Sequence, residues 1–85
     1  MAVFEVEIRV MPRATLLDPQ GQAVQHALAA LGFGGVEGVR VGKALHLTVQ
    51  APDGATAERE ARAMCERLLA NPVTEDFAVT VGVAP

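Results

Sequence analysis

The stretch Leu17-Asp18-Pro19-Gln20-Gly21-Gln22-Ala23-Val24-Gln25-His26-Ala27-Leu28 carries the strongest local signal in this 85-residue sequence. Asp18 can accept hydrogen bonds from the first free N–H groups of a helix. Pro19 fits the first helical position, where its missing N–H costs nothing. Apolar residues then recur at helical spacing, at Ala23, Val24, Ala27, Leu28 and Leu31. Gly32 is typical of a helix C-terminal end, so we predict a helix over residues 19–31.

Four stretches of the chain alternate in polarity or are rich in β-forming residues, which predicts strands. They lie near residues 4–10, 36–41, 45–49 and 77–83. Proline cannot donate to a strand ladder, so Pro12 ends the first of them. Gly42-Lys43 between the second and third predicts a type II′ hairpin turn, because glycine suits the first central position.

A second amphipathic helix is predicted over residues 55–70, capped by Asp53 or Thr56 and stopped by Asn71-Pro72. The element order is then β-α-β-β-α-β. This order predicts an α+β fold, a two-layer sandwich of an antiparallel sheet with two helices on one face. We expect residues 1–85 to form a single domain.

The face of the sheet away from the helices is predicted to be polar and small. It would carry Glu5, Glu7, Arg9, His46, Thr48, Ala78, Thr80 and Gly82. Such a face suits either a second sheet packed against it or direct contact with solvent, and both interpretations stay open.

Size and composition predict self-association. A chain this short buries only about two thirds of its unfolded surface, so its stability is marginal. One cysteine rules out an intramolecular disulfide, and 51% of the residues are hydrophobic. Association with further copies is the remaining way to bury more surface. We expect an oligomer, with dimer and tetramer both open.

Charge and aromatic content argue against a nucleic-acid binder. The net charge is −3, with three Phe, no Trp and no Tyr, whereas single-strand binders combine basic grooves with stacking aromatics. The N-terminus lacks the features of a signal peptide, and no apolar run approaches the roughly 20 residues needed to cross a bilayer. A cytoplasmic location is expected.

The sequence shows no catalytic constellation. It contains no serine, and Cys65 falls in the apolar stripe of the second helix, where a free cysteine acts as a small hydrophobe. His26 and His46 lie on different elements without metal-ligand spacing. The glycine-rich residues 32–35 follow a helix instead of opening one, which argues against a phosphate loop. We therefore predict no cofactor, metal or active site in this chain.

Four ordered blocks give the chain a family resemblance. Residues 17–28 are followed by Val39-Arg40-Val41-Gly42-Lys43, by residues 64–72 ending in Asn71-Pro72, and by Val73-Thr74-Glu75-Asp76-Phe77. Together they resemble the PurS family, the small subunit of phosphoribosylformylglycinamidine synthase. The resemblance extends over nearly the whole chain. His46 departs from it, because an acid is frequent there, and so does Phe77, where a tyrosine is frequent.

The resemblance implies a non-catalytic role in purine biosynthesis. In that family PurL binds ATP, with Mg expected beside it, and converts formylglycinamide ribonucleotide to its amidine. PurQ hydrolyses glutamine, and PurS bridges PurL and PurQ and assists ammonia transfer. Two other classes stay open: a stand-alone dimeric metabolite-sensing module, and an enzyme in its own right.

Two groups of residues are predicted to contact partners. The helix cap does not require the two glutamines near it, so the first group is expected at the interface with PurL or PurQ; it comprises Asp18, Gln20, Gly21 and Gln25. The second group is expected on an exposed docking surface and comprises Arg13, Arg40 and Lys43.

Overall fold

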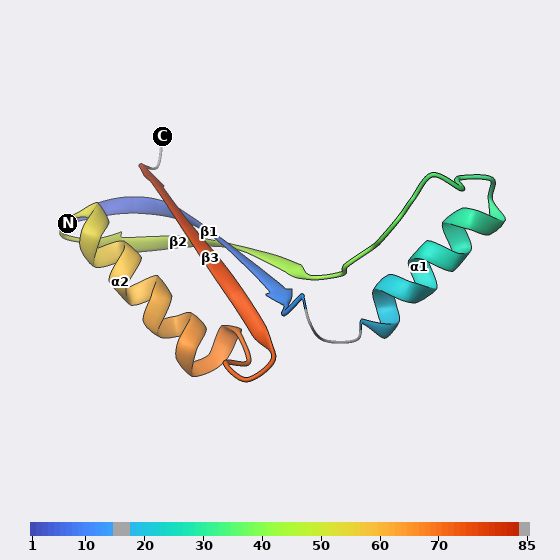
Figure 1. Ribbon diagram of the computed structural model, residues 1–85. Helices are drawn as coiled ribbons and strands as arrows, with labels where there is room; N and C mark the ends of the chain where they lie inside the picture. Colours follow the sequence, from blue (N-terminus) through green and yellow to red (C-terminus); the bar gives the residue numbers. More distant parts are fainter. Residues whose placement is uncertain (15–17, 84–85) are drawn as a thin grey trace.

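The computed structural model describes residues 1–14 and 18–83 and is shown in Figure 1. Its strands are β1 (Ala2–Pro12), β2 (Lys43–Ala51) and β3 (Glu75–Val83). Its helices are α1 (Pro19–Ala30), α2 (Gly54–Met64) and the π-helical turn η1 (Cys65–Leu69). The order is β-α-β-α-β, which confirms the α+β class and the antiparallel sheet.

The sheet has the order β2-β1-β3, with β1 antiparallel to both neighbours. Ile8 stands at its centre, opposite Leu45 on β2 and Val79 on β3. Alternation along β1 places every second residue in the core, and the buried ones are Phe4, Val6, Ile8 and Val10. The predicted alternation of buried and more exposed side chains along residues 4–10 is therefore confirmed.

Helix α2 packs on this apolar face through its smallest side chains. Ala57, Ala61 and Cys65 have no exposed surface, so the helix lies close to the sheet. Asp53 caps it by accepting a 2.8 Å hydrogen bond from the Thr56 N–H, which confirms Asp53 as the cap. The helix ends in a π turn, in which the Ala70 N–H donates to the Cys65 carbonyl at 3.0 Å.

Helix α1 does not lie on the sheet of its own chain, so the prediction of two helices on one face is wrong for the single chain. Figure 1 shows α1 beyond the end of the sheet, and Gly21 is its only buried residue. The radius of gyration is 16.4 Å, against about 12 Å expected for a compact chain of this length. We call residues 18–42, which comprise α1 and the extended segment after it, the arm.

The predicted strand over residues 36–41 is extended but pairs with no strand among the described residues. The hairpin prediction at Gly42-Lys43 is also wrong. A type II′ turn needs a positive φ at Gly42, and Gly32, with φ 99°, is the only described residue of that kind. A Cβ on Gly42 would overlap the Val10 carbonyl and Met11 Sδ, so glycine allows the chain to pass the end of β1.

The remaining local expectations concern the end of α1 and the polar face. The Phe33 N–H donates to the Leu28 carbonyl at 3.0 Å beside the left-handed Gly32, which confirms the glycine stop. The sheet face away from α2 is polar, and its residues are exposed except for half-buried Glu7.

Among the residues that the structure describes, no helix is long and apolar enough to cross a membrane.

Candidate partner-binding surface

Asp18 joins the beginning of α1 to the extended segment that follows the helix. One carboxylate oxygen accepts a 2.9 Å hydrogen bond from the Gly21 N–H, as expected of a helix cap. The other accepts a 2.8 Å bond from the Val41 N–H, 23 residues away in the sequence. A single carboxylate therefore ties together the two ends of the arm.

Gly21 and Gln25 complete this junction from the next turns of the helix. A Cβ on Gly21 would overlap the Val39 carbonyl oxygen, so only glycine allows the extended segment to approach this closely. One turn later, Gln25 Nε2 donates to the Val36 carbonyl at 3.3 Å. We call Asp18, Gly21 and Gln25 with residues 36–41 the clamp; its internal contacts give the arm a defined shape.

The N–H groups of Gly21 and Val41 lower the pKa of Asp18 below its ordinary value of 3.8, with Arg40 adding to the effect. A lowered pKa means that the ionised carboxylate stabilises the arm at neutral pH and that this contribution is lost as the pH falls through the folded-state pKa. We predict that the Val41 amide loses protection from hydrogen exchange when the pH is lowered well below 4, while Asp18→Asn removes this response.

The pKa of Asp53 provides an internal control for this prediction. The Thr56 N–H lowers it in the same way at the start of α2. The amides of α2 should therefore keep their acid response in Asp18→Asn. Equal acid responses of the Val41 amide in the variant and the parent chain would exclude the proposed role of the Asp18 carboxylate.

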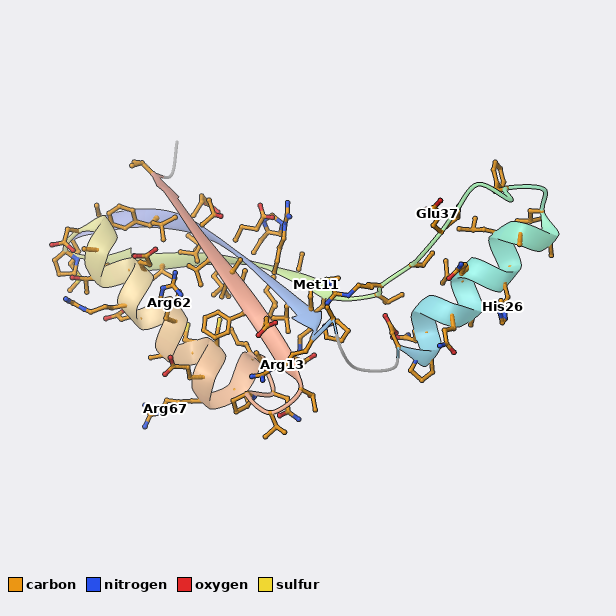
Figure 2. All side chains as sticks on the ribbon, viewed as in Figure 1. Met11, Arg13, His26, Glu37, Arg62 and Arg67 are labelled. Atoms are coloured by element: carbon orange, nitrogen blue, oxygen red, sulfur yellow. The ribbon has the colours of Figure 1, made fainter. Side chains whose placement is uncertain are left out.

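Two of the predicted docking residues hold the sheet to neighbouring segments. Arg13 donates from Nη2 to the Pro72 carbonyl at 2.7 Å, and its Nε lies 3.6 Å from Asp76 Oδ1. Figure 2 shows Arg13 beside the turn that leads into β3. Arg40 donates to the Pro12 carbonyl, which anchors the arm to the end of β1. These contacts give both arginines a structural function.

Gln20 and Lys43 differ from the other predicted residues in the freedom of their side chains. Both are exposed, and neither side chain makes a hydrogen bond or ion pair within residues 1–14 and 18–83. The part played by Val36, Val39 and Val41 in the clamp was not predicted from sequence. These residues contact the helix through backbone atoms, which no side-chain pattern indicates. The excess of glycine near the arm was the one available indication.

The clamp and most of the three strands lie within the part of the chain that matches a known protein family. A model of the PurS family, described as phosphoribosylformylglycinamidine (FGAM) synthase, matches residues 5–82. The chain belongs to the PurS family. Among PurS relatives, the phosphoribosylformylglycinamidine synthase subunit of Synechocystis is 45% identical over 78 residues, which cover 92% of this chain and 78% of the relative.

Solved structures of the PurS family superimpose on nearly the whole chain. Bacillus subtilis PurS superimposes with a TM-score of 0.84 at 40% identity, covering 93% of this chain and 98% of that one. A chain in the structure of PurLQS from Thermotoga maritima reaches a TM-score of 0.89 at 33% identity, covering 96% and 100%. The arm spans 25 residues, from 18 to 42, so superpositions that cover 93% and 96% of this chain must include most of it.

Proposed function

We propose that this chain is a non-catalytic subunit of phosphoribosylformylglycinamidine synthase that bridges PurL and PurQ and assists ammonia transfer. The observation that carries the proposal is the match, over 96% of this chain, to a chain of the Thermotoga maritima PurLQS structure. The reaction of the complex is the ATP- and glutamine-dependent conversion of formylglycinamide ribonucleotide to its amidine. ATP and Mg belong to PurL in this proposal.

The chemistry of the chain supports a role without an active site. The sequence has no serine, and its only thiol, Cys65, is fully buried against the sheet. Burial raises the pKa of that thiol, which disfavours the reactive thiolate. Cys65 therefore serves as a packing residue, as expected from its place in the apolar stripe.

The deciding experiment compares two nitrogen sources. Purified PurL and PurQ of the same source are assayed with and without this chain, first with glutamine and then with free ammonia. We expect glutamine-dependent synthesis only when the chain is present and ammonia-dependent synthesis in both cases, because free ammonia needs no transfer between subunits. Equal glutamine-dependent rates with and without the chain would overturn the proposal. Saturable metabolite binding by the isolated chain would then favour a sensing module.

Gln20 is the clamp-side residue proposed to contact PurL or PurQ. It adjoins the clamp but is exposed and bonded to none of the described side chains. We predict that Gln20→Ala weakens binding to the PurL–PurQ pair severalfold and leaves the thermal midpoint of the isolated chain unchanged. Gln22→Ala, on the same helix and also exposed, is the matched control. Titration calorimetry on both variants measures the effect, and identical affinities would remove Gln20 from the interface.

A further inference from the structure

The free edge of β3 lacks the features by which proteins protect an edge strand. In the part of the chain that the structure describes, β3 pairs only with β1, so its other side carries unpaired N–H and C=O groups. Edge strands are commonly protected by a bulge, a proline or a basic side chain. The register with β1 runs from Glu75 to Val83 without a bulge, and the strand contains no proline, lysine or arginine. This edge is therefore open to another strand.

The side chains of β3 also favour pairing. Residues 77–83 are uncharged and rich in valine, and uncharged segments of high β-propensity readily add to one another when they are exposed. The two acids at the beginning of the strand are used within the chain. Glu75 Oε1 accepts a 2.7 Å hydrogen bond from the Asn71 N–H, and Asp76 forms the ion pair with Arg13. Residues 77–83 therefore present an edge that does not repel a second strand.

The apolar row of β3 is only partly covered by its own chain. Phe77, Val79 and Val81 are half-buried against the core. A shallow hollow lies beside Val81, between the end of β3 and the start of α2, and Glu58 contributes to its lining. The uncovered side of this row continues to the free edge, where an adjoining strand with apolar side chains on the same face would bury it.

We propose that β3 of one copy pairs antiparallel with β3 of a second copy, about a two-fold axis at Val79. The two sheets then form one continuous sheet, and both α2 helices lie on the same face of it. The interface is isologous, since each copy gives and receives the same strand. This inference goes beyond the proposed function, because it concerns copies of this chain and neither PurL nor PurQ.

The sequence of β3 is complementary to itself in this register. Phe77 of one copy lies opposite Val81 of the other, beside the hollow. Such aromatic–β-branched pairs stabilise antiparallel strands, and symmetry forms this one twice. Asp76 lies opposite Gly82, so no two carboxylates face each other. A parallel arrangement in register would instead place each acid beside its own copy, and like charges directly opposite each other are destabilising.

A second copy fits this edge better than another segment of the same chain. Residues 36–41 are extended and unpaired among the described residues, but they continue directly into β2, which lies across β1 from the free edge of β3. Arg40 holds this segment at the Pro12 carbonyl. Figure 1 shows α1 and the segment after it beyond the end of the sheet. The arm is therefore placed away from the edge that needs a strand.

Disulfide formation between exposed positions tests the pairing on the chain alone. In the proposed register Ala78 lies opposite Thr80 of the second copy, and both side chains are exposed on the polar face. Ala78→Cys and Thr80→Cys chains are mixed and mildly oxidised. We expect a disulfide between one chain of each variant, because directly opposite residues of antiparallel strands bring their Cβ atoms close enough for the bond.

The control for this experiment is Thr48→Cys mixed with Thr80→Cys. Thr48 is also an exposed threonine on the polar face, but it lies on β2, at the other edge of the sheet. This mixture should form several-fold less of the mixed disulfide. The parent chain should form none, because its Cys65 is buried. Equal yields from the two mixtures would overturn the proposed pairing.

Two charge variants test whether this contact holds the copies together. Ala78→Asp/Thr80→Asp places two carboxylates opposite each other on both sides of the axis, and this chain should sediment at about half the mass of the parent chain. Ala78→Asp/Thr80→Lys places a carboxylate opposite an ammonium group and should keep the parent mass. Thermal unfolding of both variants checks that they fold, and the disulfide experiment decides alone if one does not.

The charge variants also distinguish a second copy from a partner protein. A folded double-aspartate chain that keeps the parent mass would overturn the pairing of β3 with itself. If that chain also lost its binding to PurL and PurQ, the edge would belong to a partner protein instead. Loss of mass in the double-aspartate chain alone, with the mixed disulfide formed, supports the continuous sheet.

Discussion

Replacing Gly21 by alanine is expected to weaken self-association by about tenfold or more, which corresponds to about 1.4 kcal/mol. Alanine favours an isolated helix over glycine by about 1 kcal/mol, so helix propensity alone predicts a more stable α1. The added Cβ would, however, overlap the Val39 carbonyl oxygen and approach Asp18 Oδ2 to 2.8 Å. Backbone cannot give way as a flexible side chain does, and the overlap should separate α1 from residues 36–41.

Sedimentation of the Gly21→Ala chain over a range of concentrations measures this effect. Gly34→Ala is the matched control, because a Cβ there meets nothing within 4 Å and Gly34 lies in the same arm. The control should associate like the parent chain. A Gly21→Ala chain that associates as tightly as the control would show that the approach of Val39 to the helix has no part in assembly.

Replacing Ile8 by alanine is expected to lower the free energy of unfolding by about 2–5 kcal/mol. Ile8 has no exposed surface, and its neighbours across the strands are Leu45 and Val79. Three antiparallel strands meet at this position, so little of the surrounding structure can close the resulting cavity. A domain of this size has a total stability of only about 5–15 kcal/mol, so the loss is a large share of it.

Thermal or denaturant unfolding at one fixed protein concentration measures the effect of Ile8→Ala, since the stability of an oligomer depends on concentration. Val83→Ala is the control on β3, because Val83 is 78% exposed. Its effect should stay within about 0.5 kcal/mol. Similar losses for the two variants would place the core elsewhere than in the centre of the sheet.

The elements that were predictable from sequence depend on interactions between residues that are close together in the chain. Alternation along residues 4–10 reports which side chains face the core, and Asp53 and Asp18 both cap helices as their positions indicated. The apolar stripe of the second helix predicted the burial of Cys65 correctly, whereas Met64 and Leu68 of the same stripe are 37% and 81% exposed. Each of these features depends on residues within a few positions of one another, so one sequence is enough to recognise them.

The candidate site was only partly predictable for the same reason. Asp18, Gly21 and Gln25 were singled out because the cap does not explain all of them, and the clamp now explains these three by contacts with residues 36–41. Those contacts go to backbone atoms, whose positions no side-chain pattern encodes. Their expected contacts with PurL or PurQ stay predictions.

The sequence by itself determined the three strands of the sheet, the helices, their caps and the family, because alternation, capping residues and ordered motif blocks are local properties of the chain. It did not show that residues 36–41 would stay unpaired. Only the tertiary structure decided where α1 lies. Gly42 is compatible with a hairpin turn and with an extended passage, and local sequence does not distinguish them. Close packing against Val10 and Met11 and the bond from the Val41 N–H to Asp18 favour the extended passage. Those contacts join residues distant in sequence, and they direct the arm away from its own core.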